Sequence, residues 1–592
     1  MGSQNNILDI GQIKKGKIRF SGKGNLHGLE VPGWAPYFLI IIAVIFLTGY
    51  FLWYAPYGVP MGDSYIHFVY ARNLVTYGEF SFNPGILEGV GSTSFLWVIT
   101  LAIFLLLGIS PVIASKILGI SLLAVSGCLV LDLAQKCIPS QFENRKMLFA
   151  TAVALLAVIP GSMIWLALSG METMLFLTLG LLSVWLYSRE KWVPLGVTLG
   201  LFALTRIEGV ILAGVLLLVD VLRNRRISPN IMKFILPMLM LLTPWMVYMQ
   251  IREGMLIPSS FLGRKIVISE LDKILSNEFP KVSWLLRVNP LVFICSWLYF
   301  TFLYITGSFV LPSPMIPFGE NIAGIDIAMP LTGILVSSLV CLPLLFLAFK
   351  HIQRGRHILS LREPGQRLLI VIFSWVLLHN LAYALFLPQT GAAGRYVPMN
   401  HMLFWIFLFI GMMLIKNRIA RVAASFILIG LIGLSINYWL DVYHSNINYL
   451  LKVRIPAADY IDKHYQPDTR IGATDLGPIG YFARQPVVDL AGHINKEFAE
   501  FYHNGGSFSD YLLSDKLCYL MLPDSIDEPE LDIAKILGYY DNENFDLVEE
   551  ASFAVSTDEW KVGNEPLRNY LPKVNIYQVV WHDQSTCIQG LE

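Results

Sequence analysis

Charged residues are scarce in this sequence, and neither sign is in excess. Asp, Glu, Lys and Arg make up 15% of the 592 residues, and Lys plus Arg equal Asp plus Glu at 43 each. A protein that binds nucleic acid carries a basic surface, so this balance argues against nucleic acid as a partner. Hydrophobic residues reach 55%, a proportion typical of membrane proteins.

Cysteine is also rare. The six cysteines form no CxxC pair and no cluster with histidine, which excludes structural zinc and redox pairs. Cys518 and Cys587 both lie in the polar C-terminal region. A disulfide between them is one hypothesis if that region lies in an oxidising compartment. The alternative is a buried Cys518 and an unpaired Cys587 near the chain end.

Long apolar segments follow the polar and basic residues 1–33. A transmembrane helix needs about 20 apolar residues, and about thirteen candidate segments are present, several of them short. They lie at 34–55, 95–109, 112–135, 147–168, 173–187, 192–205, 208–222, 233–251, 287–309, 328–350, 367–388, 398–415 and 419–440. We predict a polytopic α-helical membrane domain at 34–444 with about 11–13 transmembrane segments.

Basic clusters indicate the orientation, because Lys and Arg collect on the cytoplasmic side. They occur before the first segment and at 136–146, 189–191, 223–226, 350–367 and 416–421. The predicted topology has a cytoplasmic N-terminus and places residues 445–592 on the opposite side. That tail has short β-like runs at 470–473, 486–490, 517–522 and 574–581, with helical stretches near 457–464 and 495–503. We expect a soluble extracytoplasmic α/β domain there.

The first predicted outside loop, 56–94, concentrates polar residues. Tyr65, Phe68, Val69, Arg72 and Asn73 follow helical spacing, which predicts an amphipathic helix along the membrane interface. Asp63 lies in its first turn. One interpretation is a helix cap; the other is a general base that takes a proton from an acceptor hydroxyl.

The rest of the loop favours the second interpretation. Glu88, Ser92 and Thr93 lie in a Gly-rich stretch that runs into the next apolar segment, as a site for a polar headgroup would. The loop reads GDSYIHFVYARNLVTYGEFSFNPGILEGVGSTSFLW from Gly62 to Trp97. It resembles the first periplasmic loop of C-type (GT-C) glycosyltransferases, most closely the terminal arabinofuranosyltransferase group of bacteria.

Further motifs extend the resemblance in the same order. They are Ser169–Thr173, Leu204–Gly209, Ile257–Ser260 with Lys265 after it, Gly394–Tyr396 and, in the tail, Asp475–Tyr481 and Val488–Gly492. The family implies a GT-C fold in a bacterial cell (inner) membrane and a polyprenyl-phosphate sugar donor. It also implies an inverting single displacement and a loop aspartate as base. A pentofuranose such as arabinofuranose is the sugar that the subgroup suggests, and the acceptor would be a glycan or a lipid-linked molecule.

One position departs from the family. Its loop commonly opens with two adjacent acidic residues, whereas this chain has Gly62 before Asp63. Either Asp63 or Glu88 substitutes for the missing carboxylate, or catalysis is impaired. Asp63 with Glu88 could also bind a divalent cation, Mg or Mn, although no cofactor is required by the sequence.

The other charged candidates have two interpretations. Glu172, Arg206 and Glu208 lie close to apolar helices, where charge is costly without a partner. They could form an ion pair that holds helices together. Alternatively, Arg206, Arg395, Lys265 or Arg72 holds the donor phosphate, which needs positive charge. His67 is either a solvated interface residue or a donor to that phosphate.

Three classes of function are therefore compatible with the sequence. A glycosyltransferase that also contacts membrane lipids is favoured because the ionisable residues gather at one face. A transporter of lipid-linked sugars would carry them near the middle of the membrane. A non-catalytic protein that binds lipid or glycan is the third class, and Gly62 favours it.

Overall fold

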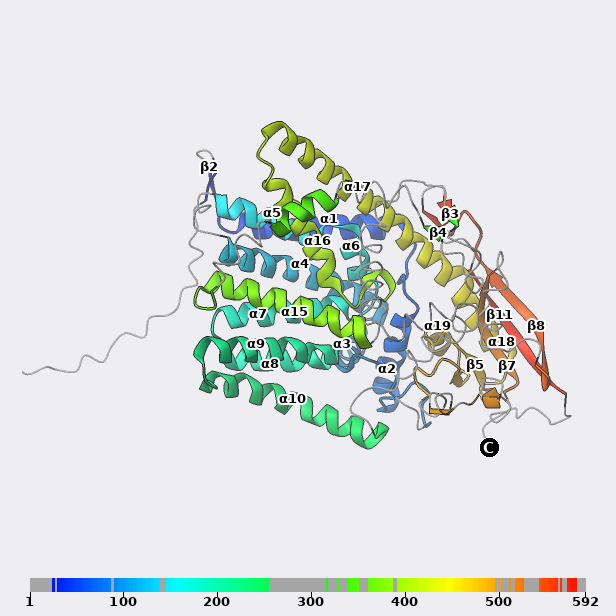
Figure 1. The fold of residues 1–592 in the computed structure, drawn as a ribbon. Helices are drawn as coiled ribbons and strands as arrows, with labels where there is room; N and C mark the ends of the chain where they lie inside the picture. The colour runs from blue at the N-terminus through cyan, green and yellow to red at the C-terminus, as the bar shows by residue number, and fades with distance from the viewer. Residues whose placement is uncertain are drawn as a thin grey trace, which may run out of the picture.

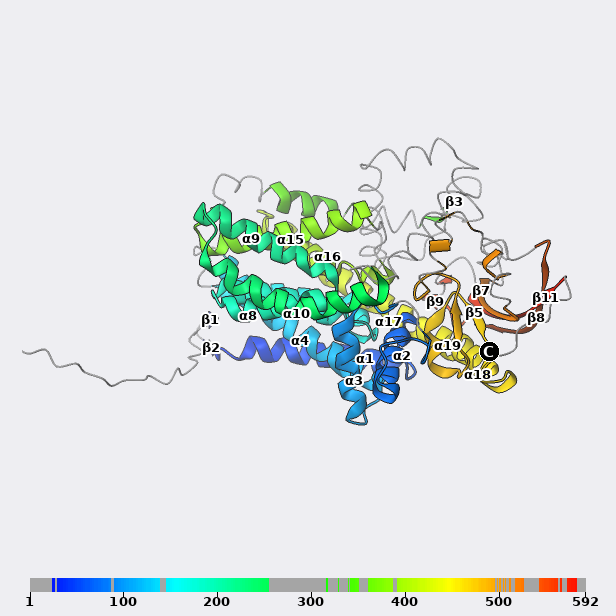
Figure 2. The ribbon, with the colours of Figure 1, turned by 90° about the horizontal axis from the view of Figure 1, so that it is seen from below.

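The structure is a computed structural model of the chain. It describes residues 24–26, 29–86, 90–138, 145–254, 316–317, 328–329, 339, 341–350, 360–386, 391–495, 498, 500–501, 504, 506, 510–512, 517–525, 542–562, 565–566 and 572–582. Figures 1 and 2 show a helical bundle with a domain containing a β-sheet at one end.

The bundle consists of apolar helices that lie side by side (Figure 1). They are α1 (Ala35–Tyr54), α3 (Phe95–Leu106), α4 (Pro111–Cys137), α5 (Lys146–Val158), α6 (Gly161–Leu168), α7 (Thr173–Ser188), α8 (Trp192–Thr205), α9 (Val210–Asn224), α10 (Pro229–Glu253), the helix Cys341–Lys350, α15 (Pro364–Phe386), α16 (Pro398–Met413) and α17 (Arg418–Tyr449). Their buried core includes Leu123, Phe176, Phe202 and Trp375. Between membrane helices such side chains stabilise the bundle through close packing, because lipid tails are as apolar as the side chains themselves.

Length and composition make this a multi-pass membrane protein. Among the described residues, five helices are long and apolar enough to cross a membrane, or six if one bent pair forms a single span. The predicted class, an α-helical membrane protein with a C-terminal α/β domain, is confirmed. The predicted segment 287–309 and most of 328–350 lie outside the described residues, so the number of crossings stays a prediction.

The bent pair consists of α5 and α6, which lie where the sequence predicted one segment. The sequence favoured a single segment at 147–168, but α5 and α6 meet at an angle of 56°. Pro160 lies at this break and has no backbone N–H to donate within a helix. Gly161 then packs against α17, where a Cβ would lie 2.4 Å from the carbonyl oxygen of Ser435. The bend therefore allows close contact between two helix backbones.

The C-terminal domain is built on a five-stranded sheet in the order β6-β5-β7-β11-β8. Its strands are β5 (Ile471–Ala473), β6 (Val487–Asp489), β7 (Tyr519–Ser525), β8 (Phe545–Ala554) and β11 (Pro572–Trp581). β5 pairs in parallel with β6 and β7, whereas β11 is antiparallel to β7 and β8. All four predicted β-like runs form strands, and β8 is an addition. Cys587 lies outside the described residues.

Short elements complete the described chain. Two-stranded pairs join β1 (Gly24–Leu26) to β2 (Leu29–Val31), β3 (Ile316–Pro317) to β4 (Ala328–Met329), and β9 (Lys561–Val562) to β10 (Glu565–Pro566). The domain also holds α18 (Ile455–His464) and α19 (Leu476–Phe482). A π-helical turn, Leu450–Arg454, joins α17 to α18, so one helical run reaches from Arg418 to His464.

The first loop forms α2 (Asp63–Tyr77), the predicted helix, and packs against the C-terminal domain. Tyr65 contacts the rings of Tyr481 and Phe482, each with ring centroids 5.3 Å away. Asn83 pairs with the edge strand β6, donating to the carbonyl of Val487 (2.8 Å) and accepting from its N–H (3.0 Å). The apolar face of α2 thus lies in a core shared with the domain. The sequence predicted that this helix lies along the membrane interface, but its apolar side chains pack against the C-terminal domain instead.

Candidate functional site

Asp63 lies where the bundle meets the C-terminal domain. It opens α2, and its side chain keeps 45% of its surface exposed. Its Oδ2 accepts a hydrogen bond from Arg395 Nη2 at 2.7 Å. The guanidinium of Arg395 is buried and also donates to Met61 Sδ at 2.9 Å. An accessible carboxylate therefore sits beside a fixed buried cation.

The charge of Arg395 controls the proton affinity of Asp63. Burial would raise the pKa of Asp63, but Arg395, with His493 and Arg454, lowers it to about 2. Asp63 is therefore ionised throughout the physiological range. If the guanidinium of Arg395 binds another anion, it stabilises the Asp63 carboxylate less. The pKa of Asp63 then rises, and Asp63 accepts a proton more readily.

The Ser169–Thr173 link lies directly behind the first loop. Ser64 Oγ donates to the carbonyl of Ser169 at 2.6 Å, and Trp97 Nε1 donates to that of Gly170 at 3.1 Å. Gly170 has a φ of +83°, and a Cβ there would lie 2.9 Å from Ser64 Oγ. This turn therefore requires glycine. Two motifs far apart in the sequence form one surface here.

A buried chain of polar groups starts at this surface. Ser92 Oγ and His67 Nδ1 share a hydrogen bond of 2.9 Å, and His67 Nε2 lies 3.4 Å from Glu172 Oε2. Glu172 Oε1 lies 2.7 Å from Arg206 Nη1. Arg206 Nη2 then reaches Glu208 Oε1 at 3.1 Å. Arg206 therefore forms the ion pairs with Glu172 and Glu208 that one of the two interpretations expected.

Two tyrosines connect this chain to Arg395. Tyr383 OH accepts from Arg206 Nη2 at 2.6 Å and donates to Glu208. Both guanidiniums lie near the ring of Tyr396, with that of Arg206 4.6 Å and that of Arg395 5.0 Å from the ring centroid. An aromatic face attracts such cations. Arg206 and Arg395 therefore both contact one aromatic ring.

Several predicted site residues lie together at this junction, and others do not. Asp63, Arg395, His67, Ser92, Glu172, Arg206 and Glu208 are brought together as described above. Thr93 is half-buried next to Ser92. Glu88 and Lys265 lie outside the described residues, and so does the proposed Asp63–Glu88 metal pair. Among the residues that the structure describes, no group of three or more His, Cys, Asp or Glu could hold a metal ion.

Arg72, one of the residues predicted to hold the donor phosphate, contacts the C-terminal domain. Its Nη1 and Nη2 donate to the carbonyls of Tyr481 and Gly480 at 2.9 and 3.0 Å. These carbonyls belong to the last turn of α19, which has few partners of its own. We therefore leave Arg72 out of the phosphate site proposed below.

Sequence reasoning missed the contribution of the C-terminal domain. Arg454 Nε lies 2.6 Å from Asp475 Oδ2, and both side chains are partly buried beside Asp63. Burial raises the pKa of Asp475, and the charge of Asp63 adds to this effect while Arg454 opposes it. Asp475 stood in a motif that carried the family resemblance, but no local pattern indicated that it meets α2.

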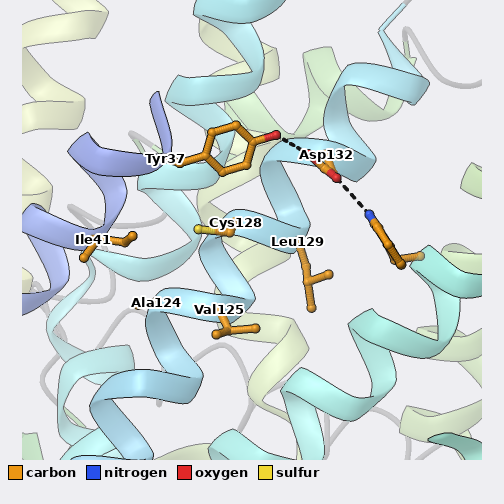
Figure 3. A pocket seen from close by; sticks show the side chains of 8 residues that line it. Tyr37, Ile41, Ala124, Val125, Cys128, Leu129 and Asp132 are labelled. Atoms are coloured by element: carbon orange, nitrogen blue, oxygen red, sulfur yellow. Dashed lines mark hydrogen bonds between the residues drawn. The ribbon is translucent and has the colours of Figure 1, made fainter. Parts of the chain in front are cut away.

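A separate polar cluster lies at the opposite end of the bundle. Asp132 accepts hydrogen bonds from Tyr37 and from Trp185 Nε1 (2.8 Å) at the edge of a mainly apolar pocket of about 210 Å³ (Figure 3). Arg189 lies 3.3 Å from the same carboxylate. These contacts join α1, α4 and α7 and satisfy one charge near a helix end. We interpret the cluster as structural.

Fold and site together define a multi-pass membrane protein in which Asp63, Glu172, Arg206 and Arg395 lie at the end that carries a small α/β domain. Residues 443–576 match the family model of a domain of unknown function, DUF8728. A comparison with curated protein sequences gives no match.

A comparison with solved structures matches two proteins, among others. The archaeal oligosaccharyltransferase AglB from Archaeoglobus fulgidus, in complex with an inhibitory peptide and a dolichol-phosphate, is 11% identical. That comparison covers 82% of this chain and 69% of AglB, with a TM-score of 0.48. ArnT from Cupriavidus metallidurans, bound to undecaprenyl phosphate, is 12% identical. Here 92% of this chain and 98% of ArnT are covered, with a TM-score of 0.46.

Proposed function

We propose that this protein is a GT-C-type glycosyltransferase that moves a sugar from a polyprenyl-phosphate donor to a glycan or lipid-linked acceptor. The reaction takes place at the membrane face that carries the C-terminal domain, which we take to be the outer side of a bacterial cell membrane. The observation that carries the proposal is the exposed Asp63 beside the buried Arg395, at 2.7 Å.

The charges suit a single displacement. A donor phosphate near Arg395 would meet a fixed cation, which stabilises the negative charge of a leaving phosphate. Arg206 lies next to this site but is already paired with Glu172 and Glu208. The acceptor oxygen attacks the anomeric carbon from the other side and loses its proton to a carboxylate of the site. Displacement of this kind inverts the anomeric configuration, as the resemblance to C-type enzymes implies.

The position of the charges favours an enzyme over a transporter. Asp63, Glu172, Arg206 and Arg395 all lie at or between helix ends on the side of the C-terminal domain. A transporter would need ionisable groups near the middle of the membrane, where a substrate is exchanged between two faces. The finer assignment, transfer of a pentofuranose such as arabinofuranose, rests on the resemblance of the first loop.

Purified protein in lipid nanodiscs tests the proposal. It is mixed with a panel of polyprenyl-phosphate sugars, arabinofuranose included, and envelope glycan acceptors, and mass spectrometry follows the glycan product and the polyprenyl phosphate released. We expect one donor to be consumed, with Asp63→Asn about 100-fold slower or worse. The control Asp558→Asn changes a tail carboxylate that is 92% exposed and should transfer normally.

The alternatives predict other results. Donor binding without turnover in the wild-type protein indicates a non-catalytic lipid-binding protein. Movement of the intact donor between the leaflets of a vesicle, without transfer, indicates a transporter. Wild-type turnover by Asp63→Asn would contradict the role of this carboxylate.

A further inference from the structure

Gly62 has no side chain, and the side chains of Arg454 and Asp475 occupy the space that one would fill. A Cβ at this position would lie 2.0 Å from Arg454 Nη1 and 3.5 Å from Asp475 Oδ1. Gly477 packs just as closely from the other side, since its Cβ would lie 2.1 Å from the Gly62 carbonyl oxygen. The start of α2 and the start of α19 are therefore in direct backbone contact, with Arg454 and Asp475 filling the place of a side chain.

Arg454 lies in the long helical run Arg418–His464, which places its side chain next to Gly62. Arg454 ends the π-helical turn Leu450–Arg454, and such turns inside helices redirect side chains and are frequent at functional sites. Its guanidinium also lies over the ring of Tyr449, 4.7 Å from the ring centroid. The Arg454 guanidinium therefore contacts both the Tyr449 ring and the Asp475 carboxylate.

The result is a second ion pair beside the first. Asp63 pairs with Arg395 at 2.7 Å, and Asp475 pairs with Arg454 at 2.6 Å. The two carboxylates are close enough to influence each other: the charge of Asp63 raises the pKa of Asp475. Asp475 therefore binds a proton more readily than Asp63, whose pKa Arg395 lowers to about 2.

We propose that Asp475, supplied by the C-terminal domain, is the second carboxylate of the active site and accepts the proton of the acceptor hydroxyl. This inference rests on the glycosyltransferase function proposed above. In the reaction, the acceptor oxygen forms a bond to the anomeric carbon while the bond from that carbon to the phosphate oxygen breaks. The bonding electrons leave with the polyprenyl phosphate. The hydroxyl proton passes to Asp475, and Asp63 keeps Arg395 directed at the phosphate.

The division of roles explains why glycine is suitable at position 62. A side chain there would displace the guanidinium that holds Asp475. The chain therefore carries its second acid on the C-terminal domain, opposite the helix that bears Asp63. The active site is then complete only when this domain is docked on the first loop.

Two variants and a matched control test this inference in nanodiscs, with the donor and acceptor that the wild type uses. Asp475→Asn leaves Arg454 without its anion, so the double variant Asp475→Asn/Arg454→Gln removes both charges together. We expect both variants to slow transfer at least about 100-fold, while binding of polyprenyl phosphate alone changes less than about fivefold. The control Asp462→Asn breaks a more exposed pair of the same domain, Asp462–Arg484 at 2.8 Å, and should transfer normally.

The outcomes separate this inference from the function on which it rests. Near-normal transfer by the double variant overturns the role of Asp475, while the active wild type leaves the glycosyltransferase proposal standing. Loss of both polyprenyl phosphate binding and transfer by the double variant also overturns it, because the pair then only holds the domain in place. A wild type that transfers from no donor overturns the proposed function itself.

Discussion

Neutralising Glu172 tests whether the buried ion network holds the helix ends together. The side chain of Glu172 is 1% exposed and that of Arg206 is 5% exposed, with 2.7 Å between their charged atoms. Glu172→Gln leaves Arg206 buried with Glu208, 3.1 Å away, as its remaining carboxylate among the described residues. Breaking a buried pair costs about 3–5 kcal/mol. We expect about 3 kcal/mol, because Glu208 still compensates part of the charge.

This loss corresponds to a measurable change in melting temperature. At about 2.1 cal/mol/K per residue, unfolding of a chain of 592 residues gains about 1.2 kcal/mol/K, so the shift is about 2–3 °C. Tryptophan fluorescence of the protein in detergent, recorded during heating, gives this value. Glu190→Gln is the control: its pair with Arg223 is 3.7 Å long and Glu190 is 56% exposed, so a change below about 0.5 kcal/mol is expected.

The double variant Glu172→Gln/Arg206→Met completes the test. Removing both charges costs less than stranding one of them, so the double variant should be more stable than the sum of the two single changes implies. The expected coupling is about 1–3 kcal/mol. Strict additivity, or a Glu172→Gln protein that melts within 0.5 °C of the wild type, roughly the error of the comparison, would refute the reasoning.

Three further predictions concern the contacts around the first loop. Asn83→Ala removes both hydrogen bonds to Val487; it should cost about 2 kcal/mol and speed proteolytic release of the C-terminal domain. Gly170→Ala forces a side chain into positive φ close to Ser64; a loss of about 1–2 kcal/mol in thermal unfolding is expected, and none would contradict the turn. The folded pKa of Asp63 is depressed to about 2, so its contribution to stability is complete above the ordinary value of 3.8 and is lost as pH falls through 2. The difference in melting temperature between wild type and Asp63→Asn should therefore be constant from pH 5 to 7, both about a unit or more above that value, and shrink below it.

The membrane helices could be predicted because their signal is local. About 20 consecutive apolar residues suffice to identify a span, and the predicted segments around α1, α4, α10, α15 and α17 coincide with the five long apolar helices among the described residues. Short β-like runs in the tail likewise predicted β5, β6, β7 and β11. The break at Pro160 was missed because an apolar count does not register one missing backbone donor.

The candidate site was predictable in part. Glu172, Arg206 and Glu208 were identified because charge beside apolar segments is costly and needs an explanation. Asp63 was identified from its place in the polar first loop, and Arg395 from a motif of the resemblance and the positive charge that a phosphate needs. Their partners were not predictable from spacing. Arg72 looked available for a phosphate, yet it binds the carbonyls at the end of α19, which no pattern in the first loop could indicate.

The sequence by itself therefore determined that this is a membrane protein with a polar first loop and an α/β tail, because hydrophobic length and periodicity are properties of neighbouring residues. The tertiary structure decided which charges meet. Asp475 and Arg454 reach Gly62 only after the tail packs on α2, and Arg206 and Arg395 reach the ring of Tyr396 only after the helices of the bundle pack together. Coulomb energy depends on distance in space and on burial, and neither quantity is encoded in the spacing of residues along the chain.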